Sequence, residues 1–202
     1  MAPVKFMGFY RFCEVIQPIK GHRCNPAGDG ASRAAGFTLL ELLITIAVLT
    51  FLVTVAAPSL QATLRNNRLM TQTNLFIGAL NLARSEAIKR GRRVTLCKTS
   101  DQQRCTSAGG YQQGWLVFAD THNFAVFDAD ETIIQVFAPV TGGLTLTGNT
   151  NVRDYVSYDA TGASRLINGG FQAGTITLCQ DAAARKIIIN PTGRIRSARD
   201  TC

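Results

Sequence analysis

The chain has 202 residues, of which 46% are hydrophobic, and this length provides for one globular domain with a core and one extended appendage. An assembly of several large domains is therefore excluded. The formal net charge of +8 is compatible with an acidic partner such as nucleic acid or anionic lipid, but charge alone does not choose between them.

An apolar segment near the N-terminus, residues 37–57, contains a single charged residue, Glu41. About 20 such residues are needed to cross a bilayer as a helix, so the segment is predicted to span a membrane. Basic residues outnumber acidic ones before it. By the positive-inside tendency, residues 1–36 are expected in the cytoplasm and the C-terminal part on the exported side. The basic residues are Lys5, Arg11, Lys20, Arg23 and Arg33, and the acidic ones are Glu14 and Asp29.

An ordinary secretory signal, cut after Ala57, is the alternative interpretation of this segment. Its apolar run is longer than the roughly 7–15 residues of a signal peptide, and Pro58 would directly follow the cut bond. In addition, an unpaired carboxylate such as Glu41 costs on the order of 2–4 kcal/mol at the centre of a bilayer. We therefore expect a retained helix in which Glu41 has a partner.

Residues 33–41, RAAGFTLLE, resemble the processing site of type IV prepilins and type II secretion pseudopilins. The resemblance implies that residues 1–36 are a leader, that a prepilin peptidase cuts after Gly36, and that the new amino terminus of Phe37 is methylated. It also implies an assembly role for Glu41, whose carboxylate would neutralise the N-terminal amine of a neighbouring subunit. The leader is longer than in many family members, and a start at Met7 or beyond would leave this assignment intact.

After Pro58 the pattern changes from apolar on all sides to amphipathic. One helix is predicted from about residue 37 to residue 90, with Gly91 as its C-terminal cap, and residues 58–91 form its amphipathic half. Arg65, Arg68, Arg84 and Lys89 fall outside the apolar face of this half. The apolar face itself consists of Leu69, Phe76, Leu80, Ala83 and Ala87.

Residues 92–202 have the alternating pattern and the turn residues of an antiparallel β-rich head. Residues 114–118, GWLVF, followed by Asp120, resemble the signature strand of the GspH/FimT subgroup of minor pilins and pseudopilins. The resemblance implies an α+β pilin fold, in which a long spine helix packs on antiparallel sheet. The predicted strands are residues 93–97, 114–119, 132–138, 144–147, 155–158, 174–180 and 185–190.

Cysteine usage agrees with an exported head. Cys13 and Cys24 lie in the leader, and the four others allow three disulfide pairings. We favour Cys97–Cys105, which closes a short polar loop, and Cys179–Cys202, which ties the C-terminal tail to a strand. A zinc ion held by these four thiolates is the alternative, but no C-x-x-C spacing supports it.

A basic segment is predicted as a loop between the last strand and Cys202. It contains Arg194, Arg196 and Arg199. If the segment is extended, Arg194 and Arg196 face one surface, where two guanidinium groups suit adjacent phosphates. Gly193 would allow backbone N–H groups to approach the same anion.

Gly193-Arg194-Ile195-Arg196 resembles the C-terminal G-R-x-R of FimT-type minor pilins, which bind DNA during natural transformation. The resemblance implies that these residues contact double-stranded DNA. Arg185 and Lys186, or the helix-end residues Arg90, Arg92 and Arg93, would extend the motif into a basic stripe if the fold brings them near. Two alternatives remain. In the first, the arginines are only the solvated end of a strand. In the second, the protein is a non-DNA-binding minor pilin or pseudopilin that primes filament assembly.

Other residue clusters do not indicate an enzyme, a cofactor or a metal. The acidic residues Asp120, Asp128, Asp130 and Glu131 do not have the spacing of a calcium loop and are interpreted as an acidic surface loop. His122 is the one histidine outside the leader and is interpreted as solvated. The expected partners are double-stranded DNA, other pilins, prepilin peptidase and the inner membrane, with the head later in the periplasm or outside the cell.

Overall fold

The computed structural model describes residues 36–202 apart from residue 123, and the chain divides into two compact units between Thr45 and Ile46. The predicted leader, except for Gly36, lies outside the described residues. One helix, α1 (Leu39–Arg90), runs from the apolar segment into the head, as the sequence predicts.

Both ends of α1 have the hydrogen bonds that helix termini require. At the start, the backbone N–H of Glu41 donates to Thr38 Oγ1 at 3.2 Å, a side-chain cap. At the end, Gly91 has φ +63, and the N–H groups of Gly91 and Arg92 donate to the carbonyls of Ile88 and Ala87. This is the Schellman arrangement, so the prediction that Gly91 ends the helix is confirmed.

The N-terminal half of α1 is long and apolar enough to cross a membrane. Its side chains are exposed from Leu39 to Leu64, apart from Pro58, whose side chain is not described. The hydroxyls in this half donate to carbonyls of the helix itself, which satisfies them without water. These hydroxyls belong to Thr45, Thr50, Thr54, Ser59 and Thr63.

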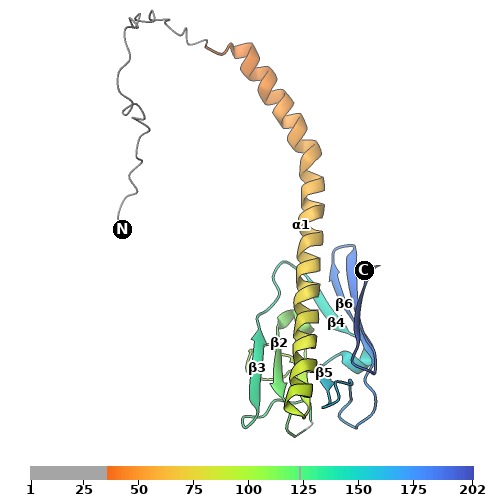
Figure 1. Ribbon diagram of the computed structural model, residues 1–202. Coiled ribbons are helices and arrows are strands. Elements are labelled where there is room, and N and C mark those ends of the chain that lie inside the picture. The colour runs from red at the N-terminus through yellow and green to blue at the C-terminus, as the bar shows by residue number, and fades with distance from the viewer. Residues whose placement is uncertain (1–35, 123) are drawn as a thin grey trace, which may run out of the picture. The chain divides into compact units, whose positions relative to one another are not determined.

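The head consists of two antiparallel four-stranded sheets beside the C-terminal half of α1 (Figure 1). The first sheet has the order β3-β2-β1-β5 and the second β4-β6-β7-β8. The strands are β1 (Val94–Lys98), β2 (Trp115–Ala119), β3 (Thr132–Phe137), β4 (Thr145–Gly148), β5 (Tyr155–Tyr158), β6 (Gly174–Gln180), β7 (Ala183–Ile189) and β8 (Ile195–Thr201). Two 3-10 turns, η1 (Tyr111–Gln113) and η2 (Thr150–Val152), complete the elements.

One hydrophobic core joins α1 to both sheets. Phe76 of the helix contacts the rings of Tyr111 and Trp115 edge-on, with centroids 5.1 and 5.0 Å apart. Trp115 in turn stacks on Phe137 at 5.3 Å. Helix residues Leu80, Ala83 and Ala87 are also fully buried, and the second sheet contributes Ile176, Leu178, Ile187 and Ile189. The apolar helix face predicted from periodicity is therefore the face that packs on the head.

The main difference from the sequence-based expectation is β8. All seven predicted strands are present, with ends shifted by at most two residues, but residues 195–201 were expected to be a loop. Instead they pair with β7 along its whole length, from Ile195 opposite Ile189 to Thr201 opposite Ala183. The expectation was wrong because β8 has one inward apolar residue, Ile195, and is held mainly by its backbone pairing.

Candidate nucleic-acid interface

The turn between β7 and β8 is fixed in a conformation that only glycine adopts easily. Gly193 is buried and has φ +76. Its N–H donates to the Asn190 carbonyl at 2.8 Å, and the Asn190 N–H donates to the Arg194 carbonyl at 3.0 Å. A Cβ atom at position 193 would collide with the carbonyl oxygen of Gly162. The N–H of Gly193 itself is therefore already used within the turn and is not free to bind an anion.

Arg84 of α1 holds this turn against the neighbouring loop. Its Nε donates to the Gly162 carbonyl at 3.0 Å and its Nη2 to the Thr192 carbonyl at 3.3 Å. Ser164 adds a second attachment, since its Oγ donates to the Asn190 carbonyl at 2.8 Å. Sequence reasoning missed this role of Arg84, because a lone arginine off the apolar face of a helix gives no signal that it reaches a distant turn.

Arg194 and Arg196 extend from this fixed turn into solvent. Both are exposed, and Ile195 between them is partly buried against the core. Arg194 directly precedes β8 and Arg196 lies in it, and alternation along an extended chain favours the same side for both side chains. Within the described part of the chain, neither guanidinium group forms an ion pair. The hairpin thus presents two adjacent cations without compensating charge.

The other two arginines of the predicted site lie on the opposite face of the second sheet. Arg199 pairs directly with Arg185 across β7 and β8, in register with core residue Leu178 of β6. Both arginines line a depression beside Asn66 and Met70 of α1. The seven-residue site is therefore divided by strand alternation, and Arg185 and Arg199 do not share a surface with Arg196.

Lys186 shares the outer face with Arg196, but its charge is compensated. Its ammonium lies 2.6 Å from Asp200 Oδ2. The hydrogen bond from Lys186 lowers the pKa of the Asp200 carboxyl, and partial desolvation opposes this effect. Lys186 therefore adds a donor to this face and little net charge.

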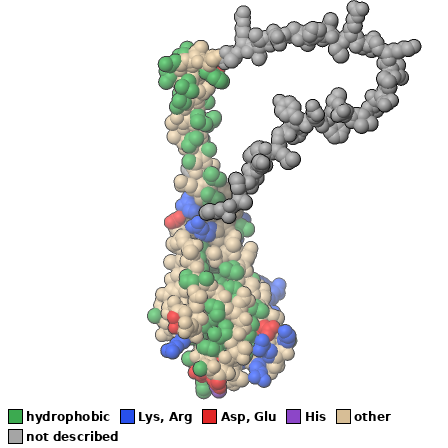
Figure 2. Space-filling view, turned by 90° about the vertical axis from the view of Figure 1, so that its left-hand side faces the viewer, with side chains coloured by type: hydrophobic (Ala, Val, Ile, Leu, Met, Phe, Trp, Pro, Cys, Tyr) green, Lys and Arg blue, Asp and Glu red, His purple; other side chains and the backbone are tan. Residues whose placement is uncertain are grey.

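The arginines at the end of α1 do not complete the expected stripe. Arg90 pairs with Glu86 at 2.6 Å and thereby lowers the pKa of that carboxyl. Arg93 donates to Ser157 Oγ and to the Leu166 carbonyl, both at 3.2 Å. Arg92 lines a depression beside β2 and β3 in the first sheet. Figure 2 shows basic side chains on both flanks of the head, with acidic ones near them and at its lower tip.

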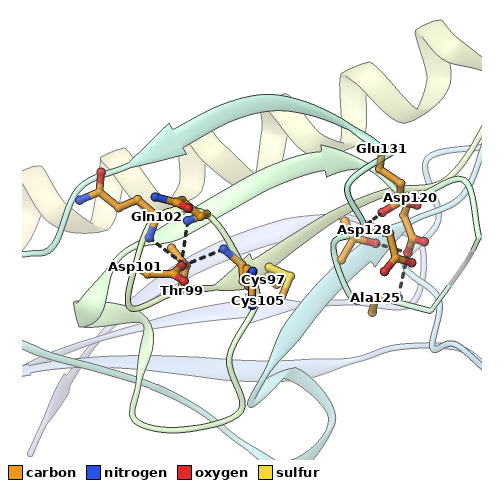
Figure 3. Close-up of a disulfide and its surroundings, with 12 residues drawn as sticks. Cys97, Thr99, Asp101, Gln102, Cys105, Asp120, Ala125, Asp128 and Glu131 are labelled. Carbon is orange, nitrogen blue, oxygen red and sulfur yellow. Dashed lines mark hydrogen bonds between the residues drawn. A yellow bond between two sulfur atoms is a disulfide. The ribbon is translucent and has the colours of Figure 1, made fainter.

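Both favoured disulfides are present. Cys97 bonds to Cys105 with a Cα–Cα distance of 5.6 Å, and Cys179 bonds to Cys202 at 5.8 Å (Figure 3 shows the first). The second bond joins the residue after β8 to β6, which restrains the end of the strand that carries the arginines. Since the four thiols are paired, the zinc alternative is wrong.

The acidic loop between β2 and β3 is organised around two buried carboxylates (Figure 3). Asp120 accepts hydrogen bonds from Thr95 Oγ1 and the N–H of Ala125, and Glu131 accepts from the N–H groups of Thr121 and Asp128. These two residues were interpreted as surface residues, which is wrong. Their carboxylate oxygens take the place of backbone carbonyls as hydrogen-bond acceptors for N–H groups of the loop.

Three side chains of this loop are close enough together to bind a metal ion. Ligand atoms of His122, Asp128 and Glu131 lie within 4.8 Å of one another. Both Glu131 oxygens, however, already accept hydrogen bonds from backbone N–H groups of the loop. These hydrogen bonds within the loop are sufficient to explain the position of the Glu131 carboxylate.

Comparison with known proteins identifies the family. Residues 72–193 match the model of the family described as Type II transport protein GspH. This chain belongs to that family. Residues 31–57 of the GspH-family protein also match the prokaryotic N-terminal methylation motif, and this match includes Gly36, Phe37 and Glu41. A comparison with curated protein sequences gives no match.

Solved structures support the fold. The chain is similar to the type IV minor pilin FimU of Pseudomonas aeruginosa, with a TM-score of 0.50 and 16% identity over 68% of this chain and 95% of that one. The minor pseudopilin EpsH of Vibrio cholerae gives a TM-score of 0.44 and 12% identity over 65% and 97% of the two chains. The similarity to FimU supports a type IV pilin fold.

Family, motif and fold together define the general role. The protein is a minor pilin or pseudopilin, a structural subunit rather than an enzyme. Processing by a prepilin peptidase and assembly with other pilins follow from the methylation motif and the family. The apolar half of α1 suits a membrane-anchored subunit that later joins a filament.

Proposed function

We propose that this GspH-family protein is a FimT-type minor pilin that binds double-stranded DNA during natural transformation, through Arg194 and Arg196. The observation that carries the proposal is the pair of exposed, uncompensated guanidinium groups on a turn fixed by Gly193 and Arg84. The family match ends at residue 193, so support for DNA binding comes from the hairpin and its motif, not from family membership.

Phosphates are the expected contact. Guanidinium forks bind phosphate oxygens in a planar, two-point geometry, and their charge is permanent. Contacts to phosphates carry no sequence information, so binding is expected to be largely independent of DNA sequence. Because each neutralised phosphate releases counterions, affinity should fall as salt rises.

The test compares two double variants that remove the same charge from opposite faces of one strand pair. The full chain, purified in a non-ionic detergent, is titrated with a short DNA duplex at several salt concentrations. Arg194→Ala/Arg196→Ala should reduce the slope of log K against log salt by about 1.8, or 0.9 for each lost phosphate contact. Arg185→Ala/Arg199→Ala should leave most of that slope in place.

Two outcomes contradict the proposal. One is that the unmodified chain does not bind DNA even at low salt. The other is that both double variants weaken binding equally, which would mean that binding depends on the net charge and not on the positions of the arginines. A minor pilin or pseudopilin that primes filament assembly without binding DNA would then be the better description, with Glu41 in its exposed apolar helix as the residue that carries the function.

We also propose cleavage after Gly36, methylation of Phe37 and a cytoplasmic location for residues 1–36. The support is the methylation motif at residues 31–57 and the apolar segment that follows the cut. Mass spectrometry of the subunit recovered from filaments should give an N-terminal N-methyl-phenylalanine. An N-terminus at Ser59 or nearby would show instead that the apolar segment is a removed signal peptide.

A further inference from the structure

The outer face of the second sheet, on the side away from α1, is a polar surface arranged in rows. Strand register places residues of neighbouring strands side by side in each row. One row runs Thr147, Thr177, Lys186 and Ala198, from β4 to β8. The next row toward the turn runs Thr175, Ile188 and Arg196.

Hydroxyl groups on this face are available for a ligand. Thr147 is exposed, and Thr175 and Thr177 are half-buried. Among the described residues, the structure gives none of these three hydroxyls a hydrogen-bond partner, so all three are free to donate. Thr147, Thr177 and Lys186 also line a common shallow depression. The surface therefore presents neutral donors next to cations.

Such a combination suits a phosphodiester backbone. Neighbouring strands lie about 4.8 Å apart, so the row from β8 to β4 covers about 14 Å, and successive rows are about 7 Å apart. Hydroxyl side chains are common donors to phosphate oxygens, and they position the nucleic acid without adding charge. Asp200 lies one row beyond Lys186, which places a carboxylate at the far border of the surface.

We propose that the DNA backbone lies across this face, with Arg194 and Arg196 contacting it at β8 and the hydroxyls of Thr177 and Thr147 donating to phosphates over β6 and β4. The inference rests on the proposed function and extends it from the hairpin to the whole outer face. It distinguishes two kinds of contact. The arginines set the salt dependence of binding, and the threonines add affinity that salt does not screen.

The experiment removes the hydroxyls and keeps their shape. Thr147→Val/Thr177→Val, in the full chain in non-ionic detergent, should raise the Kd for the duplex at least about 5-fold, the effect of two lost hydrogen bonds of ordinary strength. The slope of log K against log salt should not change. Thr147→Ser/Thr177→Ser, which keeps the hydroxyls, should bind as the unmodified chain does. Thr132→Val on β3 of the other sheet is the matched control.

The possible results separate this inference from the proposed function. If the valine variant binds normally while Arg194→Ala/Arg196→Ala binds weakly, the extended surface is overturned and the hairpin site stands. If the serine variant loses as much affinity as the valine variant, the hydroxyls are not the cause and the inference fails. If the unmodified chain does not bind DNA, both proposals fail.

Discussion

Gly193 has a structural role that is separate from the arginines that follow it. Its positive φ and the adjacent carbonyl of Gly162 leave no room for a side chain. Arg84 satisfies that same carbonyl and the carbonyl of Thr192. The glycine of the motif thus fixes the turn, and Arg194 and Arg196 are the residues left free to bind a ligand.

Gly193→Ala should therefore destabilise the head. The left-handed conformation alone costs an alanine about 1–2 kcal/mol, and the collision with Gly162 adds to this cost. Gly169→Ala is the matched control, because Gly169 has φ +83 and open space around a Cβ atom. Denaturant unfolding, followed by fluorescence of the buried single tryptophan Trp115, should show a clearly larger loss for Gly193→Ala. Equal losses would mean that the turn can move away from Gly162.

Among the elements, those that bury one face could be predicted from sequence. The apolar face of α1 and its glycine cap are local signals, and β6 and β7 follow from runs of β-branched residues between turns. β8 carries almost no such signal. Its sequence, IRSARDT, becomes a strand because β7 offers a free edge, and pairing of this kind depends on residues distant in sequence.

The division of the basic residues between two faces also depends on pairing. The sequence shows that Arg185, Lys186, Arg196 and Arg199 are near each other along the chain, but register decides which of them point the same way. Burial of Asp120 and Glu131 was missed for a similar reason. Acidic residues near turn signals are usually exposed, and only the folded loop shows that backbone N–H groups surround these two.

At the scale of the whole molecule, assembly and binding use different parts of the chain. The exposed apolar half of α1, with its single carboxylate, belongs to the membrane and the filament. The head buries the other half of the helix against one side of each sheet. The surface that we assign to DNA is on the other side of the second sheet, away from this core.

Hydrogen–deuterium exchange of the full chain, with and without a DNA duplex at low salt, would locate the DNA-binding surface. We predict slower exchange for peptides that cover residues 190–201 and the adjoining strands β6 and β7, with no change in β2 and β3. Protection confined to the first sheet, or no protection anywhere although DNA is bound, would contradict the assignment of the β7–β8 hairpin as the binding site.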